Sequence, residues 1–256
     1  MGRVCCHKRT ALMPPLPDLS LPDLGPPVAD WVAPSAPKGE ILSGQYCRLV
    51  PLQAEDHAAL LFNTYQGHSA LWHYMPYGPF SSAAQYHRWV RQTVENKAHL
   101  FYAIYDLDMN MFGGVASYLR INPEAGSIEI GHINFAPQLQ RSRAATEAIY
   151  LMMRWAFSAG YRRLEWKCNA CNIASRRAAQ RLGLSFEGIF RQASVVKGHN
   201  RDTAWFAAID AEWSALEQAF SVWLAPRNFA PDRTQKERLS DLTRLVRVSG
   251  DPALQR

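Results

Sequence analysis

The apolar residues of this chain recur with two different periods, and the period changes near residue 136. Residues 128–135 alternate apolar and polar positions, which predicts a half-buried strand. The alternation changes face between Ile130 and Ile133, so we expect a β-bulge near Gly131. After the strand, apolar residues are spaced three or four apart, as on one face of an amphipathic helix. The residues of that face are Ala145, Ala148, Ile149, Met152, Trp155, Ala156 and Ala159.

The same patterns divide most of the chain into further strands and helices. Besides residues 128–135, strands are predicted at residues 46–52, 100–106, 112–120, 162–168, 190–196 and 203–209. Besides the helix that follows residue 143, helices are predicted at residues 54–65, from Ser81 or Ser82 to residue 96, at 176–182 and at 212–224. This mixture predicts an α/β fold built on a mixed sheet.

The two ends of the chain lack the pattern of a buried core. Residues 1–38 hold eight prolines and no apolar period, so we expect a disordered leader. Residues 39–225 are long enough for one domain. Residues 226–256 are rich in arginine and are expected to form a basic tail with room for one short helix.

A short basic loop joins the strand at 128–135 to the helix after it. Because the helix begins at the end of a strand, its free N–H groups and the positive end of its dipole face the loop. Arg141 and Arg143 add positive charge at the same place, and together these features suit a phosphate group. The alternative is an ordinary basic turn that caps the helix.

The loop sequence Gln140-Arg141-Ser142-Arg143-Ala144-Ala145 resembles the acyl-CoA motif Gln/Arg-x-x-Gly-x-Gly/Ala of the GNAT superfamily of N-acetyltransferases. The chain also resembles the second half of that family's core, in order and spacing. The matching residues are Asn172-Ile173-Ala174-Ser175 and Leu182-Gly183-Leu184-Ser185-Phe186-Glu187-Gly188. The run Ala145-Thr146-Glu147-Ala148 is typical of the branch that includes ribosomal-protein N-terminal acetyltransferases. The resemblance covers residues 40–212, most of the chain.

The resemblance implies a fold and a co-substrate. The fold is the GNAT acyl-CoA N-acyltransferase fold, with a central, splayed, mostly antiparallel sheet flanked by helices. Two parallel strands, ending at Phe135 and Cys168, would separate, and the pantetheine arm of acetyl-CoA would lie in the gap; no metal is implied. Arg143 stands where the family has its first glycine, and an arginine already in the helix can still donate its N–H. The implied acetyl-CoA contacts are Ile133, Asn134, Phe135, Gln140, Arg141, Ser142, Arg143, Ala144, Ala145 and Asn172.

The implied reaction is direct attack of an amine on the acetyl thioester, which needs a base for the amine and an acid for the leaving thiolate. Glu129 is the candidate base, and its alternative role is an ion pair with a neighbouring arginine. His132 is a second candidate base. Many family members place a tyrosine where this chain has Ala179, so Ser175 is the candidate acid; its alternative role is to cap the helix. For Asn172, the alternative to a cofactor contact is a plain turn residue.

Four aromatic residues share one loop that also contains proline and glycine: Trp72, Tyr74, Tyr77 and Phe80. Either they line a pocket for the acceptor amine or they cover the core. Trp205 and His199 have the same two possible uses. For the acceptor itself, the resemblance favours the N-terminal α-amino group of a protein with serine or alanine first, and a small amine is second.

Composition narrows the classes of function. The net charge of +6 and the pI of 9.2 suit an anionic ligand such as CoA. The five cysteines are odd in number and irregularly spaced, which argues for a reducing compartment. Cys168-Asn169-Ala170-Cys171 has no second pair, so no metal site is expected. No apolar run is long enough to span a membrane. We therefore expect a cytoplasmic protein with no membrane partner, and a homodimer is an open possibility.

Two rival functions remain. A non-catalytic acyl-CoA-binding module is favoured by Arg143 and Ala179, which depart from the family's active-site pattern. A nucleic-acid-binding protein would interleave aromatic and basic residues along one face. Here the aromatic residues gather in one loop and the basic residues in others, so nucleic acid is not an expected partner.

Overall fold

The computed structural model describes residues 26–232 and 234–254. The chain divides into two compact units, residues 1–32 and 33–256. In the first unit the described residues, 26–32, form a bend and a turn. The helices and strands described below all belong to the second unit.

The second unit begins inside the segment expected to be a leader, residues 1–38. Pro34 is buried, and the hydroxyl of Tyr161 donates a hydrogen bond to the carbonyl of Ser35 (3.3 Å). The last residues of that segment therefore pack against the domain. The expected leader up to residue 25 lies outside the described residues.

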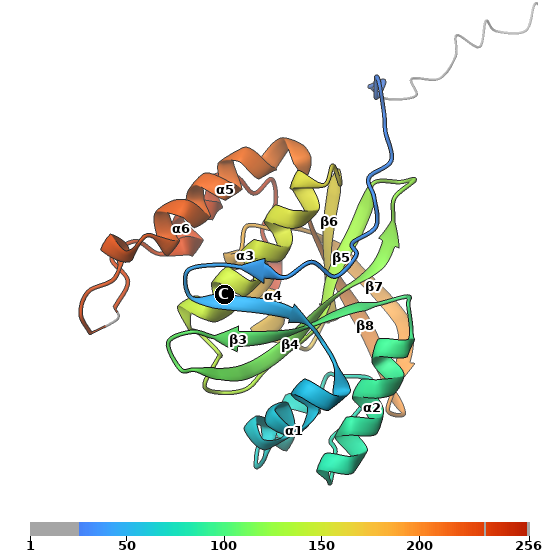
Figure 1. Ribbon diagram of the computed structural model, residues 1–256. Helices are drawn as coiled ribbons and strands as arrows, with labels where there is room; N and C mark the ends of the chain where they lie inside the picture. The colour runs from blue at the N-terminus through green and yellow to red at the C-terminus, as the bar shows by residue number, and fades with distance from the viewer. Residues whose placement is uncertain (1–25, 233, 255–256) are drawn as a thin grey trace, which may run out of the picture. The chain divides into compact units, whose positions relative to one another are not determined.

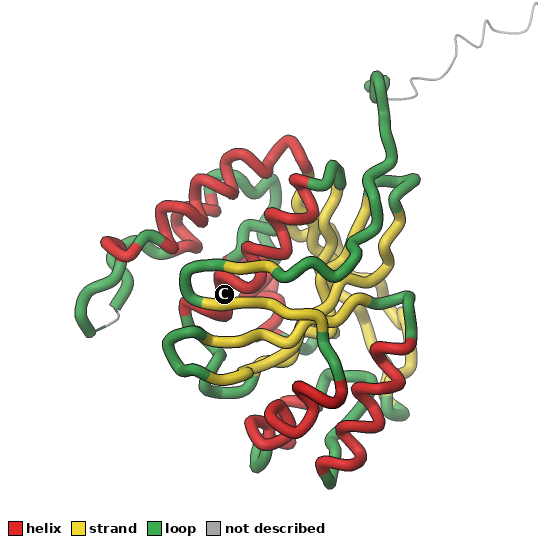
Figure 2. Tube along the Cα trace, viewed as in Figure 1, coloured by secondary structure: helices red, strands yellow, loops and turns green. Residues whose placement is uncertain are grey.

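In the described part of the chain, eight strands form one open sheet (Figures 1 and 2). Their order is β1-β2-β3-β4-β5-β6-β8-β7, and every neighbouring pair is antiparallel except β5 and β6, which run parallel. The expected mixed, mostly antiparallel sheet is confirmed. The strands are β1 (Leu42–Ser43), β2 (Cys47–Pro51), β3 (Leu100–Asp106), β4 (Met111–Asn122), β5 (Ser127–Phe135), β6 (Arg163–Asn169), β7 (Ser185–Val196) and β8 (His199–Ile209).

Helices cover both faces of this sheet. α1 and α2 lie side by side against one face, and α3, α4 and α5 pack against the other (Figure 1). The α-helices are α1 (Ala54–Tyr65), α2 (Ala83–Glu95), α3 (Arg143–Ser158), α4 (Ile173–Arg181), α5 (Asp210–Leu224) and α6 (Leu239–Arg244). Short 3₁₀ turns are η1 (Ser69–Trp72), η2 (Pro226–Asn228) and η3 (Pro252–Leu254).

Alternating residues of the central strands enter two separate hydrophobic cores. On β3, Tyr102 and Ile104 face the core under α3, whereas Phe101 and Ala103 face the core under α1 and α2. Successive side chains of a strand point to opposite faces, so both faces of this strand are buried. The apolar stripe expected for residues 145–159 belongs to the first of these cores.

β5 carries the expected bulge. Val115 of β4 lies opposite Asn134, and Ser117 lies opposite Gly131, so β5 has one residue more than β4 between these two pairs. His132 adopts φ +50° inside this stretch. The prediction of a bulge near Gly131 is confirmed, and the bulge turns the end of β5 away from a regular ladder.

A gap opens between the parallel strands β5 and β6. Their pairing covers three positions and ends with Glu129 opposite Glu165. β5 continues to Phe135 and β6 to Asn169, but the described residues beyond Glu129 form no further β5–β6 ladder. The expected separation of two parallel strands is therefore confirmed.

The segment expected to be a basic tail, residues 226–256, is folded over most of its described length. Leu239 and Thr243 of α6 are both 0% exposed. Asp251 is buried as well and forms an ion pair with Arg176 of α4. A hydrophobic pattern cannot indicate such a pair, because the two residues are 75 positions apart. We call residues 239–254 the C-terminal strap.

Candidate active site

The loop after β5 ends in a capped helix N-terminus. Ser142 is the N-cap of α3, and its Oγ accepts a hydrogen bond from the N–H of Ala145 (2.9 Å). Arg141 has φ +60°, in the left-handed region, whereas Arg143 is already the first residue of the helix. The N–H groups of Arg143 and Ala144 have no acceptor within the described chain. This end of α3 can therefore receive an anionic group.

The side chain of Arg143 is committed to protein contacts. Its guanidinium forms an ion pair with Asp108 (2.8 Å) and lies over the rings of Tyr46 and Phe229 at 4.4 and 5.1 Å. Arg141 is exposed and forms no ion pair with a described residue. The loop sequence predicts positive charge from both arginines at this place. In the structure, only the side chain of Arg141 is free to contribute its charge to an anionic group. Arg143 can contribute only its backbone N–H.

Glu147 of α3 has a structural role that the sequence analysis missed. Its buried carboxylate accepts hydrogen bonds from three consecutive backbone N–H groups, those of Gln45, Tyr46 and Cys47, at 2.8, 2.6 and 2.8 Å. A Cβ on Gly44 would lie 2.3 Å from this carboxyl group, so the contact requires glycine there. No local period indicates this role, because only the folded chain shows that Glu147 lies in a nearly continuous buried stretch of helix and needs partners there.

The bulged part of β5 is anchored from the side of α1. The hydroxyl of Tyr65 donates to the carbonyl of Asn134 (2.9 Å), and both residues are buried. The Nδ2 of the Asn134 side chain is also buried and has no partner among the described residues. Ile133 and Phe135, on either side, pack against the core under α3. A buried donor without a partner, on the strand that borders the gap, suits a site that a ligand completes.

Glu129 lies where β5 and β6 part, within a network of charged side chains. It is 3% exposed, and its carboxylate receives Arg120 Nη1 at 2.8 Å and Lys167 Nζ at 3.0 Å. Lys167 also contacts Glu165 (2.7 Å) and lies over the ring of Trp205 (3.7 Å). Burial raises the pKa of Glu129, and the two cations offset part of that rise. The ion pair with an arginine is thus confirmed, and the raised pKa keeps the carboxylate suited to proton transfer.

His132 is at the bulge and faces the aromatic loop. Its Nδ1 lies 3.1 Å from the hydroxyl of Tyr77, and the two rings stack with centroids 5.6 Å apart. Burial first, and then the nearby His99, lower the pKa of His132 to about 4. The imidazole is therefore neutral at pH 7. Burial thus weakens His132 as a base, whereas burial raises the pKa of Glu129.

Asn172 and Ser175 meet at the start of α4. Asn172 is the N-cap, and its Oδ1 accepts a hydrogen bond from the N–H of Ser175 (3.1 Å). The alternative in which Ser175 caps the helix is therefore wrong. Its Oγ accepts from Trp166 Nε1 (3.0 Å), so the hydroxyl can donate its own proton, and the side chain of Cys168 is one hydrogen-bond partner of this hydroxyl. The thiol of Cys168 lies beside this hydroxyl, and burial raises its pKa to about 11, so it stays protonated.

The aromatic loop, residues 71–80, both covers the core and reaches the edge of the gap. Trp72 is 4% exposed and belongs to the core under α1 and α2. The hydroxyl of Tyr74 donates to the carbonyl of Cys171 (3.1 Å), in the loop before α4. Lys197, in the turn between β7 and β8, donates to the carbonyl of Trp72 (2.7 Å). The loop is therefore tied to two other segments across the sheet.

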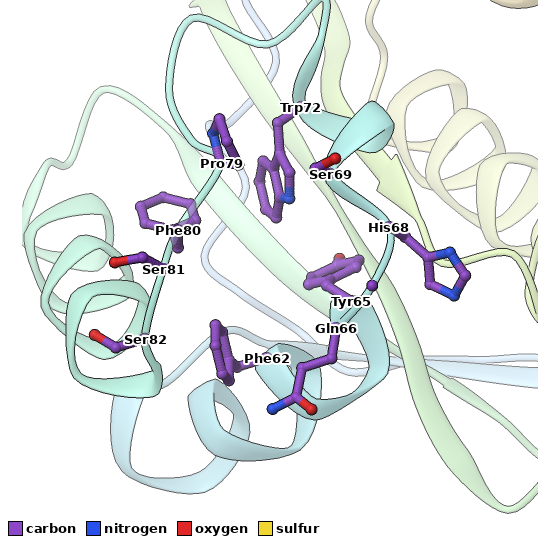
Figure 3. A pocket seen from close by; sticks show the side chains of 11 residues that line it. Phe62, Tyr65, Gln66, His68, Ser69, Trp72, Pro79, Phe80, Ser81 and Ser82 are labelled. Carbon is purple, nitrogen blue, oxygen red and sulfur yellow. The ribbon is translucent and has the colours of Figure 1, made fainter.

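A cavity of about 410 Å³ lies beside the aromatic loop (Figure 3). Trp72 and Phe80 form its wall on the loop side, and Phe62 and Tyr65 form its wall on the side of α1. The volume is within the range of small-molecule sites. Tyr74 and Tyr77 are not among its lining residues. The remaining lining residues are Gln66, Gly67, His68, Ser69, Pro79, Ser81 and Ser82.

In the residues that the structure describes, no group of three or more His, Cys, Asp or Glu could hold a metal ion. Cys168 is buried, Cys171 is exposed, and both are free thiols. No described helix is both long and apolar enough to cross a bilayer.

Comparisons with known proteins point in one direction. The family model described as an acetyltransferase (GNAT) domain matches residues 47–185. A GCN5-related N-acetyltransferase from Brucella melitensis is 40% identical, and the match covers 85% of this chain and 100% of that chain with a TM-score of 0.83. A probable acetyltransferase of the GNAT family from Chromobacterium violaceum is also 40% identical, with 75% and 96% covered and a TM-score of 0.71.

More distant structures share the fold. An acetyl transferase from Salmonella typhimurium is 22% identical, and the match covers 66% of this chain and 99% of that chain with a TM-score of 0.58. No curated protein matches this chain.

Proposed function

Since this chain belongs to the GNAT acetyltransferase family, we propose that it moves an acetyl group from acetyl-CoA to the N-terminal α-amino group of a protein that begins with serine or alanine. Acyl transfer is the activity of the family, whose members use acetyl-CoA. The observation that carries the proposal is the buried carboxylate of Glu129 at the point where β5 and β6 part.

The residues around the end of α3 fit the pyrophosphate of acetyl-CoA. The N–H groups of Arg143 and Ala144 would donate to it, and the exposed side chain of Arg141 would add charge. Ser142 keeps the helix end in shape by capping it. Gln140 supports the loop, because its Nε2 donates to the carbonyl of the last β5 residue (2.8 Å).

The gap between β5 and β6 fits the pantetheine arm, which carries amide groups. The unpaired Nδ2 of Asn134 is a donor for an amide carbonyl. Ile133 and Phe135 would offer backbone N–H groups that no neighbouring β6 residue occupies. Asn172 would approach from the start of α4, with its Oδ1 used for the cap and its amide nitrogen left to donate.

Glu129 would act as the general base. It takes a proton from the amine, directly or through a water molecule, and the amine nitrogen then forms a bond to the thioester carbonyl carbon. The carbon–sulfur bond breaks, and the departing sulfur takes a proton from the hydroxyl of Ser175. Through water, Ser175 regains the proton that Glu129 took from the amine, so that both side chains return to their starting states. Arg120 and Lys167 hold Glu129 in place and keep its carboxylate ionised before the proton arrives.

The strength of this base favours an α-amino group over a lysine side chain. An α-amino group has a pKa of about 7.8 and is roughly a quarter neutral at pH 7.4, whereas a lysine of pKa about 10.4 is only about 0.1% neutral. A carboxylate such as Glu129 can therefore serve an α-amino group, which is often already neutral. A lysine side chain is almost always protonated and would be much harder to deprotonate. The Salmonella typhimurium protein of this fold modifies the N-terminal serine of ribosomal protein L7/L12, which agrees with this choice.

A second candidate function is acetylation of a small amine. The cavity of about 410 Å³ beside Trp72 and Phe80 favours it, because an aromatic cavity with a polar rim suits a small organic molecule. A small amine presents a similar amino group, so the chemistry at Glu129 would not change.

Mass spectrometry of acetylated products separates these acceptors. The purified protein and acetyl-CoA are incubated with a peptide that begins with serine, with the same peptide blocked at its N-terminus but carrying an internal lysine, and with a panel of small amines. We expect acetylation of the free N-terminus alone, and loss of it in Glu129→Gln. Equal modification of the blocked peptide, or modification of small amines only, would contradict an N-terminal acceptor.

A further inference from the structure

The C-terminal strap, residues 239–254, is bonded to α4 and to the start of β7. Thr243 Oγ1 donates to the carbonyl of Arg181 (3.0 Å) at the end of α4. The N–H of Val248 donates to Ser185 Oγ (3.0 Å) at the start of β7. The strap thus holds the helix that carries the residues assigned to the acetyl-CoA side of the site.

One contact of the strap is ionic and buried. Asp251 is 0% exposed, and its two oxygens accept hydrogen bonds from Nε and Nη2 of Arg176 at 2.6 and 2.5 Å. The N–H of Asp251 donates to Gln180 Oε1 (2.7 Å), and the N–H of Ala253 donates to Asp251 Oδ1 (3.0 Å). A two-pronged pair of guanidinium and carboxylate fixes the orientation of the arginine as well as its position.

The remaining nitrogen of this guanidinium reaches the loop before α4. Arg176 Nη1 donates to the carbonyl of Ala170 (2.8 Å). The carbonyl of the next residue, Cys171, accepts the hydrogen bond from the hydroxyl of Tyr74 in the aromatic loop. Asn172 then caps α4 and receives the N–H of Ser175 (3.1 Å). Polar contacts therefore connect the strap to the loop that precedes both site residues.

We propose that Asp251 is a positioning residue for acetyl-CoA binding, because through Arg176 it holds residues 170–172 in the shape that presents Asn172 to the gap. This inference rests on the proposed function. Without the carboxylate, the guanidinium loses the partner that orients it, and the carbonyl of Ala170 loses a directed donor. The apolar packing of α4 stays in place, so the change is local to residues 170–172.

Two variants break this connection in different ways, and a third is the control. Asp251→Asn removes the charge that orients Arg176. Arg176→Lys keeps a cation near Asp251, but an ammonium lacks the planar fork that reaches the carboxylate and Ala170 together. Thr243→Val removes a strap contact at the other end of α4 and leaves the loop untouched. Acetyl-CoA affinity is measured by titration calorimetry, and amide hydrogen exchange is measured on the full chain without ligand.

We expect Asp251→Asn and Arg176→Lys to raise the Kd for acetyl-CoA by about tenfold, within the range of changes transmitted through a connecting residue. Both should speed amide exchange at residues 170–175. Thr243→Val should lower the melting temperature and leave Kd and this exchange unchanged. Unchanged Kd in both first variants, or equal weakening in all three, would overturn the inference. If the wild-type protein itself bound no acetyl-CoA, the proposed function would fail. In that case, unchanged amide exchange at residues 170–175 in the two variants would separately reject the role of Asp251.

Discussion

The hydroxyl of Tyr65 donates to the backbone carbonyl of Asn134 at 2.9 Å and thereby joins α1 to the bulged part of β5. Tyr65 is only 4% exposed, so water cannot easily replace this bond. The position of β5 at the gap therefore depends on a side chain from the layer of helices on the opposite face from α3.

Tyr65→Phe should lower the free energy of unfolding by about 1–2 kcal/mol, because it leaves a buried carbonyl without its donor. It should also raise the Kd for acetyl-CoA, since Asn134 borders the gap. Urea denaturation and calorimetric titration measure the two effects. Tyr102→Phe is the matched control: that tyrosine is 0% exposed and its hydroxyl has no partner among the described residues, so its loss should cost nothing. Equal effects in both variants would argue against the importance of the bond.

Arg141 and Arg143 should respond differently to the same substitution. Arg141→Ala should weaken acetyl-CoA binding by up to about tenfold, and raising the salt concentration should shrink the difference, because an exposed charge is screened. Arg143→Ala should mainly lower the melting temperature, since its guanidinium is held by Asp108 and two rings. Titrations at two salt concentrations test this. The reverse order of affinities would show that Arg143 turns toward the phosphates.

Glu129→Gln preserves the shape of the side chain and removes the base. We expect kcat to fall by about 100-fold or more, the usual effect of losing a positioned general base. Because the carboxylate must be ionised to accept a proton, kcat/KM of the wild-type protein should rise with pH through the raised pKa of Glu129. The rate and its pH profile are measured with a serine peptide. If Glu129→Gln had a normal kcat, Glu129 would not be the base, and its role would be limited to the ion pairs with Arg120 and Lys167.

Ser175→Ala tests the proton donor. If Ser175 protonates the leaving sulfur, kcat should fall by roughly 100-fold while KM for acetyl-CoA stays nearly unchanged, because the interaction forms in the transition state. Trp166→Phe is the control, since it removes the donor that Ser175 Oγ accepts from and keeps the serine hydroxyl. A lower melting temperature with normal kcat in Ser175→Ala would reject the role and leave the proton to water.

His132 should make the fold sensitive to acid. Its pKa in the folded state is about 4, below the ordinary 6.5, because burial disfavours the charged ring. The stability that this neutral ring contributes is present above pH 6.5 and is lost as the pH falls from 6.5 toward 4, up to about 3 kcal/mol. The free energy of unfolding, measured by urea denaturation across this pH range, should depend less on pH in His132→Gln than in the wild-type protein. Parallel curves for the two proteins would contradict the prediction.

The sequence could predict most of the fold because its periodicity is a local property. The helix 54–65 and the bulge near Gly131 follow the positions expected from periodicity. The separation of the strands that contain Phe135 and Cys168 was implied by the family resemblance instead. Three boundaries differ by three residues or more: α4 begins at Ile173, β7 at Ser185 and β8 at His199, each earlier than expected. The reason for the first is that Asn172 caps α4, so the helix starts directly after it.

The candidate site was harder to predict, because its side chains have partners that are distant in sequence. The sequence shows that Arg143 is positively charged, but it does not show that its guanidinium forms an ion pair with Asp108. Glu147 binds backbone groups about 100 residues away, and no local period indicates such contacts. Asp251 and Arg176 are both charged and both buried, which only the folded chain can show.

The three-residue pairing of β5 with β6 also bears on how the chain folds. Strands β1 to β5 are consecutive in chain order, and so are β6 to β8, and all neighbours within each set are antiparallel. The two sets then meet through the pairs that end at Glu129 and Glu165. We therefore expect this seam to form last, and a ligand in the gap would join two separately completed halves of the sheet.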